Sequence, residues 1–133
     1  VDADGSDQLE GETLSALGEF SRRQGAVLLA SGPVDGVFAP DGRRWEICNG
    51  HSMMSRLTGT GCMLNVLTAA FLAVGEPEEA AVAAAAMLGI CGERAAREAK
   101  GPGSLRAALL DAAYTLTPEE LDQEAAVRLV EKG

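Results

Sequence analysis

The spacing of apolar residues near the start of the chain is that of a helix. Leu14, Leu17 and Phe20 recur three positions apart, and the acidic residues Glu12 and Glu19 fall on the other side of the expected helix. This pattern predicts a helix over residues 9–24. Gly25 follows two arginines at its end, as is common at a helix C-terminus.

The next apolar residues form short runs rather than a helical stripe. Residues 26–30 are a continuous apolar run that ends in Ser-Gly-Pro, and we expect a buried parallel strand there. Residues 34–38 and 44–48 then flank Asp41-Gly42. An Asp-Gly pair between two strand-like runs predicts a β-hairpin.

The sequence of the second half of the chain predicts helices. Residues 61–74 are apolar on nearly every side, which predicts a helix that is buried all round. Three further helices are expected over residues 77–99, over residues 105–116 after an N-cap at Ser104, and from Pro118 onward after a cap at Thr117. The alanines of residues 80–86 suggest close approach to another helix. We therefore expect an α/β fold with few strands, in one domain over residues 1–133.

Charge limits the classes of partner. The 133 residues carry a net charge of −9, which argues against a nucleic-acid surface and against an anionic membrane surface. The longest apolar run, residues 62–74, is too short to span a bilayer. A small phosphorylated ligand is still possible, because it needs only a local positive field.

The cysteines and the first residues indicate the cellular compartment of the protein. Cys48, Cys62 and Cys91 are widely spaced and form no CxxC pair, which predicts neither a zinc site nor a disulfide framework. Free thiols are typical of the cytoplasm. The start, Val1-Asp2-Ala3-Asp4, does not resemble a signal peptide. It lacks an initiator Met, and we expect this chain to be a piece of something longer.

Several familiar catalytic patterns are absent from the sequence. There is no GxxxxGK[ST], no GxSxG and no HExxH, and His51 is the single histidine, in a turn. Gly59-Thr60-Gly61 begins a dinucleotide-binding pattern, but Leu64 stands where its third glycine belongs. The Cys48 and Cys91 thiols are expected to be structural.

The segment Thr58-Gly59-Thr60-Gly61-Cys62 opens the apolar helix and is the best candidate site. Two glycines let the backbone approach a ligand, and the amides of residues 59–62 lack partners if the helix starts here. The helix dipole adds positive potential, which suits a transferring phosphoryl group. A plain structural N-cap fits the pattern equally well. Cys62 itself could be a base, a nucleophile or a small buried apolar residue.

This turn and other motifs, in the same order, resemble hydroxyethylthiazole kinase, of the ribokinase-like superfamily. The matching segments are Ser31-Gly32-Pro33-Val34-Asp35, Asn49-Gly50-His51, Leu57-Thr58-Gly59-Thr60-Gly61-Cys62-Met63-Leu64, Gly89-Ile90-Cys91-Gly92-Glu93 and Lys100-Gly101-Pro102-Gly103-Ser104. Related kinases usually carry Asp where this chain has Cys62. The resemblance implies a three-layer α/β/α fold, of which this chain is the C-terminal half.

The resemblance also implies an activity. The enzyme would transfer the γ-phosphoryl group of ATP, with Mg²⁺, to the hydroxyl of 4-methyl-5-(2-hydroxyethyl)thiazole in thiamine salvage. Cys62 would be the catalytic residue, and Gly59, Thr60 and Gly61 would form the anion hole, with Gly59 also against the substrate. Ser31 matches a position, usually Thr, that contacts the nucleotide. The intact enzyme would be a cytoplasmic homotrimer with active sites at subunit interfaces.

The resemblance does not extend to a whole kinase. The N-terminal half of these enzymes would carry the thiazole pocket, an Arg on the nucleotide and the acidic Mg²⁺ site, so no metal ligand is predicted in this chain. Two alternatives stand beside the kinase. One is another ribokinase-like enzyme, a hydroxymethylpyrimidine kinase or an NAD(P)H-hydrate dehydratase. The other is a non-catalytic assembly module.

Overall fold

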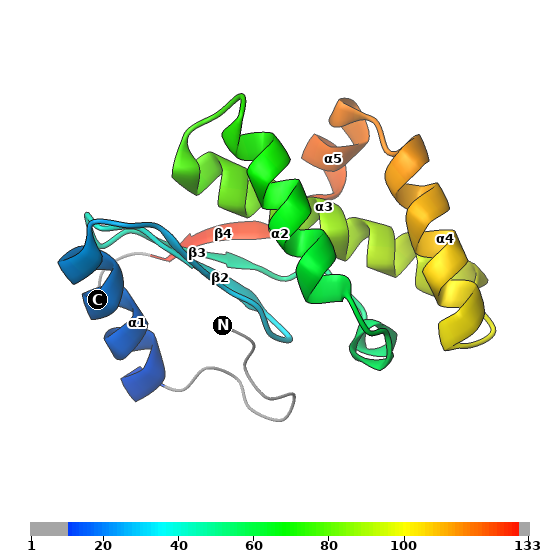
Figure 1. Cartoon of the computed structure of the whole chain (residues 1–133), viewed down its shortest axis with the longest axis horizontal. Helices are drawn as coiled ribbons and strands as arrows, with labels where there is room; N and C mark the ends of the chain where they lie inside the picture. Colours follow the sequence, from blue (N-terminus) through cyan, green and yellow to red (C-terminus); the bar gives the residue numbers. More distant parts are fainter. Residues whose placement is uncertain (1–10, 131–133) are drawn as a thin grey trace.

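A computed structural model describes residues 11–130 and confirms an α/β fold (Figure 1). The elements in chain order are α1 (Gly11–Gln24), β1 (Leu28–Ala30), β2 (Asp35–Phe38), β3 (Arg44–Ile47), the short 3₁₀ helix η1 (Ser52–Arg56), α2 (Thr60–Leu72), α3 (Pro77–Glu98), α4 (Pro102–Thr115), α5 (Pro118–Glu124) and β4 (Val127–Val130). The expected start of the first helix at Leu9 lies outside the described residues.

The strands form one antiparallel sheet in the order β1-β2-β3-β4. The predicted hairpin is confirmed: β2 pairs with β3, and Gly42 in the connection has a φ of 91°. The prediction of a parallel strand over residues 26–30 is wrong, because β1 pairs antiparallel with β2. Only four residues separate these two strands, and so short a loop can join antiparallel neighbours but cannot make a parallel crossover.

The C-terminal end of the chain adds a strand that the sequence pattern did not reveal. The final helix, α5, has the predicted cap: the Thr117 hydroxyl accepts from the Glu120 amide, and the Glu120 carboxylate accepts from the Thr117 amide. Residues 127–130 then pair with β3 as an edge strand. They escaped notice because the run is four residues long, contains Arg128 and is largely exposed.

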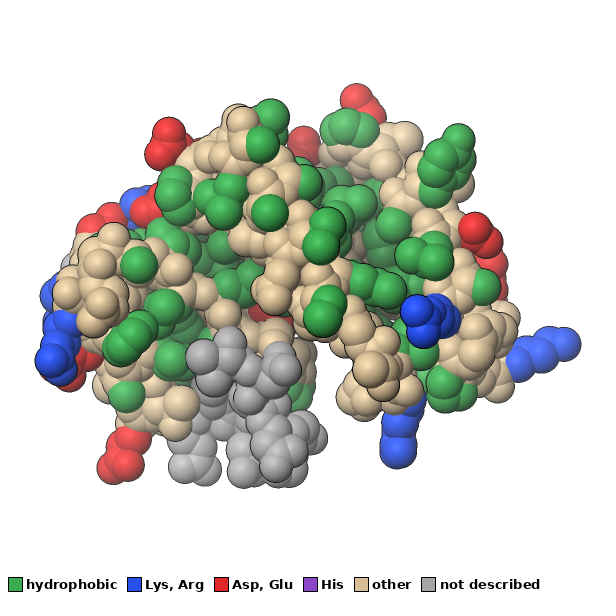
Figure 2. All heavy atoms as spheres, in the orientation of Figure 1, with side chains coloured by type: hydrophobic (Ala, Val, Ile, Leu, Met, Phe, Trp, Pro, Cys, Tyr) green, Lys and Arg blue, Asp and Glu red, His purple; other side chains and the backbone are tan. Residues whose placement is uncertain are grey.

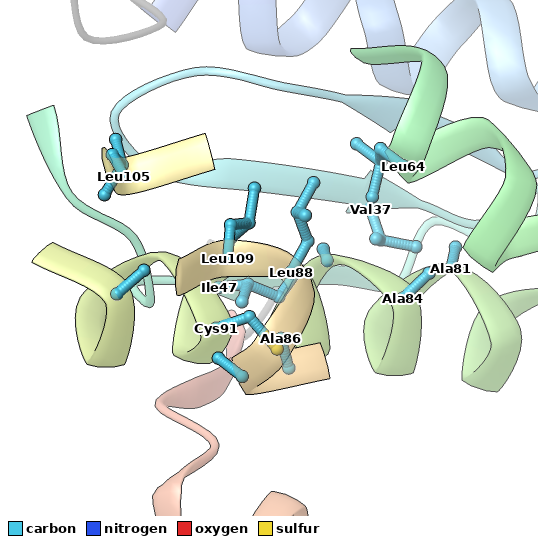
Figure 3. Packing of buried hydrophobic residues seen from close by; sticks show 13 residues of the cluster. Val37, Ile47, Leu64, Ala81, Ala84, Ala86, Leu88, Cys91, Leu105 and Leu109 are labelled. Atoms are coloured by element: carbon cyan, nitrogen blue, oxygen red, sulfur yellow. The ribbon is translucent and has the colours of Figure 1, made fainter. Parts of the chain in front are cut away.

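The sheet lies between α1 on one face and α3 on the other (Figures 1 and 3). Val37 and Ile47 are fully buried and point from the strands toward α3, while Leu64 of α2 points toward Val37. On the α1 side, the buried Ser21 hydroxyl lies 2.6 Å from the Ala26 carbonyl oxygen and 3.0 Å from that of Phe38. These contacts fix α1 against β2 and give the three layers that the resemblance implies.

Helix α3 is the centre of the core. It carries eleven buried residues and packs against both α2 and α4. Small side chains at Ala81, Ala84 and Ala85 allow the close helix approach that their pattern predicted. Cys91 also lies in this core, 1% exposed, as expected. Helix α2 is therefore packed on one side, where it contacts α3.

The prediction that residues 61–74 are buried all round is wrong. Leu64 is the buried residue of α2, whereas Val66 is 69% exposed and Val74, just after the helix, is 86% exposed. Among residues 11–130, α3 covers one side of α2 and the other side faces outward. Figure 2 shows hydrophobic side chains spread over α2 and α4, where Tyr114 is 92% exposed.

Two smaller expectations are also corrected. Ser104 is not an N-cap, because α4 begins two residues earlier, at Pro102, after a cap at Gly101. The Ser104 hydroxyl instead accepts from the Lys100 amide at 2.9 Å. Cys48, which was expected to be structural, has an exposed thiol. No helix within residues 11–130 has the length and apolar character needed to cross a membrane.

Candidate anion-binding site

The backbone of the turn before α2 has a geometry that lets a ligand approach it closely. Gly59 is the N-cap residue, with a φ of 103°, a left-handed conformation that side chains other than glycine rarely adopt. The helix begins at Thr60, one residue earlier than predicted. Its first backbone bond runs from the Met63 amide to the Gly59 carbonyl oxygen at 3.0 Å.

The amides at the start of α2 are available to a ligand. No side chain of the described residues caps the helix at Gly59, and none accepts from the amides of Thr60, Gly61 or Cys62. A structural N-cap normally satisfies one of these donors with a side-chain oxygen. Helices α3 and α4 also begin without a side-chain cap. What distinguishes the start of α2 is the cavity in front of it, where uncapped amides and the helix dipole would attract negative charge.

A cavity of about 470 Å³ opens in front of this turn. It brings together residues from β1, the loop after it and α2, which lie far apart in the sequence. The lining residues are Leu29, Ser31, Gly59, Gly61, Cys62, Leu64, Asn65 and Thr68. Four of the five predicted site residues are therefore adjacent in space. Thr60, which is half-buried, is not part of the cavity wall.

Cys62 is exposed and faces this cavity. The interpretation of Cys62 as a small buried apolar residue is therefore wrong, and its thiol is accessible to a bound molecule. His51 is a turn residue, as expected: its Nδ1 accepts from the Met53 amide at 3.2 Å and caps η1. It does not line the cavity.

The sequence reasoning missed three wall residues. Asn65 and Thr68 project from α2 one turn and two turns after Gly61, on the same side of the helix. Their signal was present: they are polar residues in a helix that is otherwise apolar. Leu29 gave no such signal, because an apolar residue in a strand is ordinary core material.

Ser31 reaches the cavity from the loop between β1 and β2. The Asp35 carboxylate, at the start of β2, accepts from the Gly32 amide at 2.9 Å and so closes this loop. Burial raises the pKa of Asp35 from 3.8 to about 6, although the bond from Gly32 opposes that shift. The loop that carries Ser31 is thus tied to a carboxylate that titrates near neutral pH.

The described residues contain no dedicated metal centre. Among residues 11–130, no three His, Cys, Asp or Glu side chains lie close enough together to hold an ion. The polar groups at the cavity are backbone amides, the hydroxyls of Ser31 and Thr68, an amide side chain and a thiol. This set fits phosphate oxygens well and Mg²⁺ poorly, since Mg²⁺ prefers carboxylate oxygens.

Comparisons with known proteins point to one family. The model of the hydroxyethylthiazole kinase family matches residues 1–119. The hydroxyethylthiazole kinase of Cereibacter sphaeroides is 47% identical over 112 residues, which are 84% of this chain and 42% of that protein. The hydroxyethylthiazole kinase of Pyrococcus furiosus is 38% identical over 118 residues, covering 88% of this chain and 42% of that protein.

A solved structure shows the same fold. The hydroxyethylthiazole kinase protein from Pyrococcus horikoshii OT3 superposes with a TM-score of 0.84 at 38% identity, over 90% of this chain and 47% of that one. This chain therefore spans less than half the length of the relatives that it matches. The family match covers most of the present chain, however, and by that match the chain belongs to the hydroxyethylthiazole kinase family.

Proposed function

We propose that this chain forms the C-terminal, phosphoryl-binding half of an ATP-dependent kinase that phosphorylates 4-methyl-5-(2-hydroxyethyl)thiazole in thiamine salvage. The observation that carries the proposal is the cavity in which the uncapped start of α2 faces Ser31 and Cys62. The names of the relatives, all hydroxyethylthiazole kinases, favour this substrate over those of other ribokinase-like enzymes.

In the proposed reaction, the thiazole hydroxyl attacks the γ-phosphorus and ADP leaves. Negative charge on the transferring group is stabilised by the amides of Gly59, Thr60 and Gly61, which need no reorganisation because the helix already orients them. Each such donor contributes on the order of 3 kcal/mol in other enzymes. Thr60 takes part through its backbone, which is consistent with a side chain that lies outside the cavity wall.

Cys62 is the proposed catalytic residue. Its exposed thiol stands at the first turn of α2, beside the amides that would hold the phosphoryl group. Its role would be to orient the substrate hydroxyl and, as the thiolate, to accept its proton and become the thiol. A loose phosphoryl-transfer transition state requires little help from a base, and a thiolate in that place is therefore sufficient.

ATP and Mg²⁺ would be bound by different parts of the enzyme. We propose that ATP meets Ser31 through its hydroxyl and meets the turn through its γ-phosphate. Mg²⁺ would neutralise the phosphates, but no ligand for it is assigned to residues 11–130, and no step is derived through the ion. The part of the relatives that lies outside this match is the proposed source of the metal site and of most of the thiazole pocket.

A ligand-dependent melting experiment tests the proposal. A ligand at about 100 times its Kd stabilises the folded state by about 2.7 kcal/mol, which raises the Tm by several degrees. We expect such a shift with ATP and Mg²⁺, and a second one with the thiazole alcohol when the N-terminal half of a relative is supplied. A well-folded chain that shifts with neither ligand would support the non-catalytic assembly module instead.

Assembly and location complete the proposal. We propose that the intact enzyme is a homotrimer in the cytoplasm. Its support is the resemblance, together with large apolar side chains that lie exposed on α2 and α4, including Val66, Leu110 and Tyr114. Sedimentation equilibrium of the intact enzyme should give three times the chain mass, and a monomer at micromolar concentration would contradict the trimer.

A further inference from the structure

We infer that Gly89, Gly92, Asn49 and Glu93 are positioning residues for the anion-binding turn: they form a seat on α3 that holds the segment leading into it. The segment runs from Asn49 to Leu57, between β3 and α2. None of these four residues lines the cavity. The inference rests on the proposed function for its purpose, and on contacts within the chain for its mechanism.

The first part of the seat is a set of hydrogen bonds around Asn49, which is 6% exposed. Its side-chain amide donates to Glu93 at 3.3 Å and to the Glu124 carbonyl oxygen at 3.0 Å, and its side-chain oxygen accepts from the Ala126 amide at 2.7 Å. The Gly50 amide donates to the same Glu93 oxygen at 2.8 Å. Asn49 and Gly50 are thus fixed to α3 and to the link between α5 and β4.

The second part is close packing at two glycines of α3. A Cβ at position 89 would lie 2.6 Å from the backbone carbon and oxygen of Asn49, a distance that real Cβ atoms do not show. A Cβ at position 92 would lie 2.0 Å from the Met54 sulfur. Asn49 therefore lies directly on the α3 backbone, and a methyl group at position 89 must push its backbone outward, whereas one at position 92 meets only the end of the flexible Met54 side chain.

The segment between Asn49 and Gly59 is short and hydrogen-bonded within itself, so the position of Asn49 affects the position of the turn. The His51 side chain and carbonyl group cap η1, and the Leu57 amide donates to the Met54 carbonyl oxygen at 3.0 Å. Two residues later the chain reaches Gly59. Helix α4 contacts η1 from another side. Because His51 caps η1 and α4 holds it, a displacement of the Asn49 backbone by a methyl group at position 89 would be passed on to the amides that would face the phosphate.

The decisive variant is Gly89→Ala in the full chain, with amide resonances of Gly59, Gly61 and Cys62 followed by NMR. We expect these resonances to move and the affinity for ATP with Mg²⁺ to fall about tenfold, because small misplacements of positioned groups are costly. Gly92→Ala should have the smaller effect of the two, because its methyl group meets only the end of the flexible Met54 side chain. Gly18→Ala is the matched control, since a Cβ in that helix meets nothing within 4 Å.

A second pair of variants covers the case in which Gly89→Ala does not fold. Glu93→Gln keeps an oxygen that accepts from the Gly50 amide, whereas Glu93→Ala removes it. We expect Glu93→Ala to move the resonances of the turn and Glu93→Gln to leave them near their original positions. Glu98→Ala, exposed on the same helix, controls for the loss of a carboxylate.

The two proposals fail separately in this experiment. If the unaltered chain does not bind ATP, the proposed function is in error, while the amide resonances still report whether the seat positions the turn. Resonances of the turn that stay unchanged in a folded Gly89→Ala chain would overturn the positioning role. Equal effects of Glu93→Gln and Glu93→Ala would overturn it as well.

Discussion

Ser31 and Cys62 line the same cavity, although Ser31 follows the edge strand β1 and Cys62 lies in the first turn of α2. The cavity wall thus joins a hydroxyl from the sheet to a thiol and backbone amides from the helix. A molecule bound there would meet all three groups at once. Each of these contacts can be removed separately by substitution.

Replacing Gly61 by Val should abolish phosphate binding. The side chain would fill the space in front of the amides while leaving α2 folded, since its helical bonds are not involved. Titration with ATP and Mg²⁺ measures the effect. Gly103→Val is a close control: Gly103 is likewise the second residue of a helix, and a Cβ there meets nothing within 4 Å. ATP affinity that survives Gly61→Val would show that the anion-hole assignment is wrong.

Replacing Cys62 by Ser should lower turnover more than it raises the KM for the thiazole alcohol. The hydroxyl keeps the size of the thiol but is a poorer proton acceptor at neutral pH. Because Cys62 is exposed, its loss should change the free energy of unfolding by less than about 0.5 kcal/mol. The kinetics are measured on the active assembly that includes the N-terminal half. A rise in KM at constant kcat would indicate a packing role instead.

The three thiols should react at different rates with a water-soluble disulfide reagent. Cys48 and Cys62 are exposed and should react in the folded chain, whereas Cys91 is 1% exposed and should react only on unfolding. Burial also raises the pKa of Cys91, which reduces its reactive thiolate. ATP with Mg²⁺ should protect Cys62 and leave Cys48 unprotected. Equal rates at both exposed thiols with and without ATP would place the ligand elsewhere.

Stability should decrease as the pH rises from about 4 to about 6, through Asp35. The folded chain holds this proton up to about pH 6 and the unfolded chain releases it near 3.8. The folded state therefore binds more protons in that window, and the stabilising contribution present below pH 3.8 is lost as the pH rises through 6. The full shift corresponds to about 3 kcal/mol, which solvent near the half-buried side chain reduces to about 1–2 kcal/mol.

Asp35→Asn isolates this effect. The Asn side chain can still accept from the Gly32 amide but does not ionise. The variant should be more stable than the unaltered chain at pH 7 by about 1–2 kcal/mol and should match it near pH 4. Urea unfolding at both pH values checks this. A variant that is less stable at pH 7 would show that the Asp35 charge is stabilising.

Helices and the hairpin could be predicted because their signals are local. Pro77, Thr117 and Gly42 mark ends and turns through their own backbone preferences, and the structure agrees at each. Burial and strand direction depend on neighbours outside the segment. The apolar composition of α2 shows that the helix can be covered on all sides, but not which side the described residues cover. The partner of β1 was likewise set by a four-residue loop.

The candidate site was partly predictable for the same reason. Two glycines before an apolar helix indicate the turn, and the order of motifs indicates the family. The distance from Ser31 to Cys62 is set by the sheet and by α3, which no local pattern encodes. Asn65 and Thr68 were missed because single polar residues in a helix are common. Only the cavity in the structure shows that they are wall residues.

The Asn49 side chain has a consequence for the order in which the protein folds. Its partners Glu93, Glu124 and Ala126 lie 44, 75 and 77 positions further along the chain. Contacts of such long sequence separation form late, because the intervening chain must first be closed into a loop. During synthesis, the segment before the turn cannot reach its final place until residue 126 has left the ribosome. The final placement of the turn would therefore have to wait for the link between α5 and β4, more than 60 residues after it.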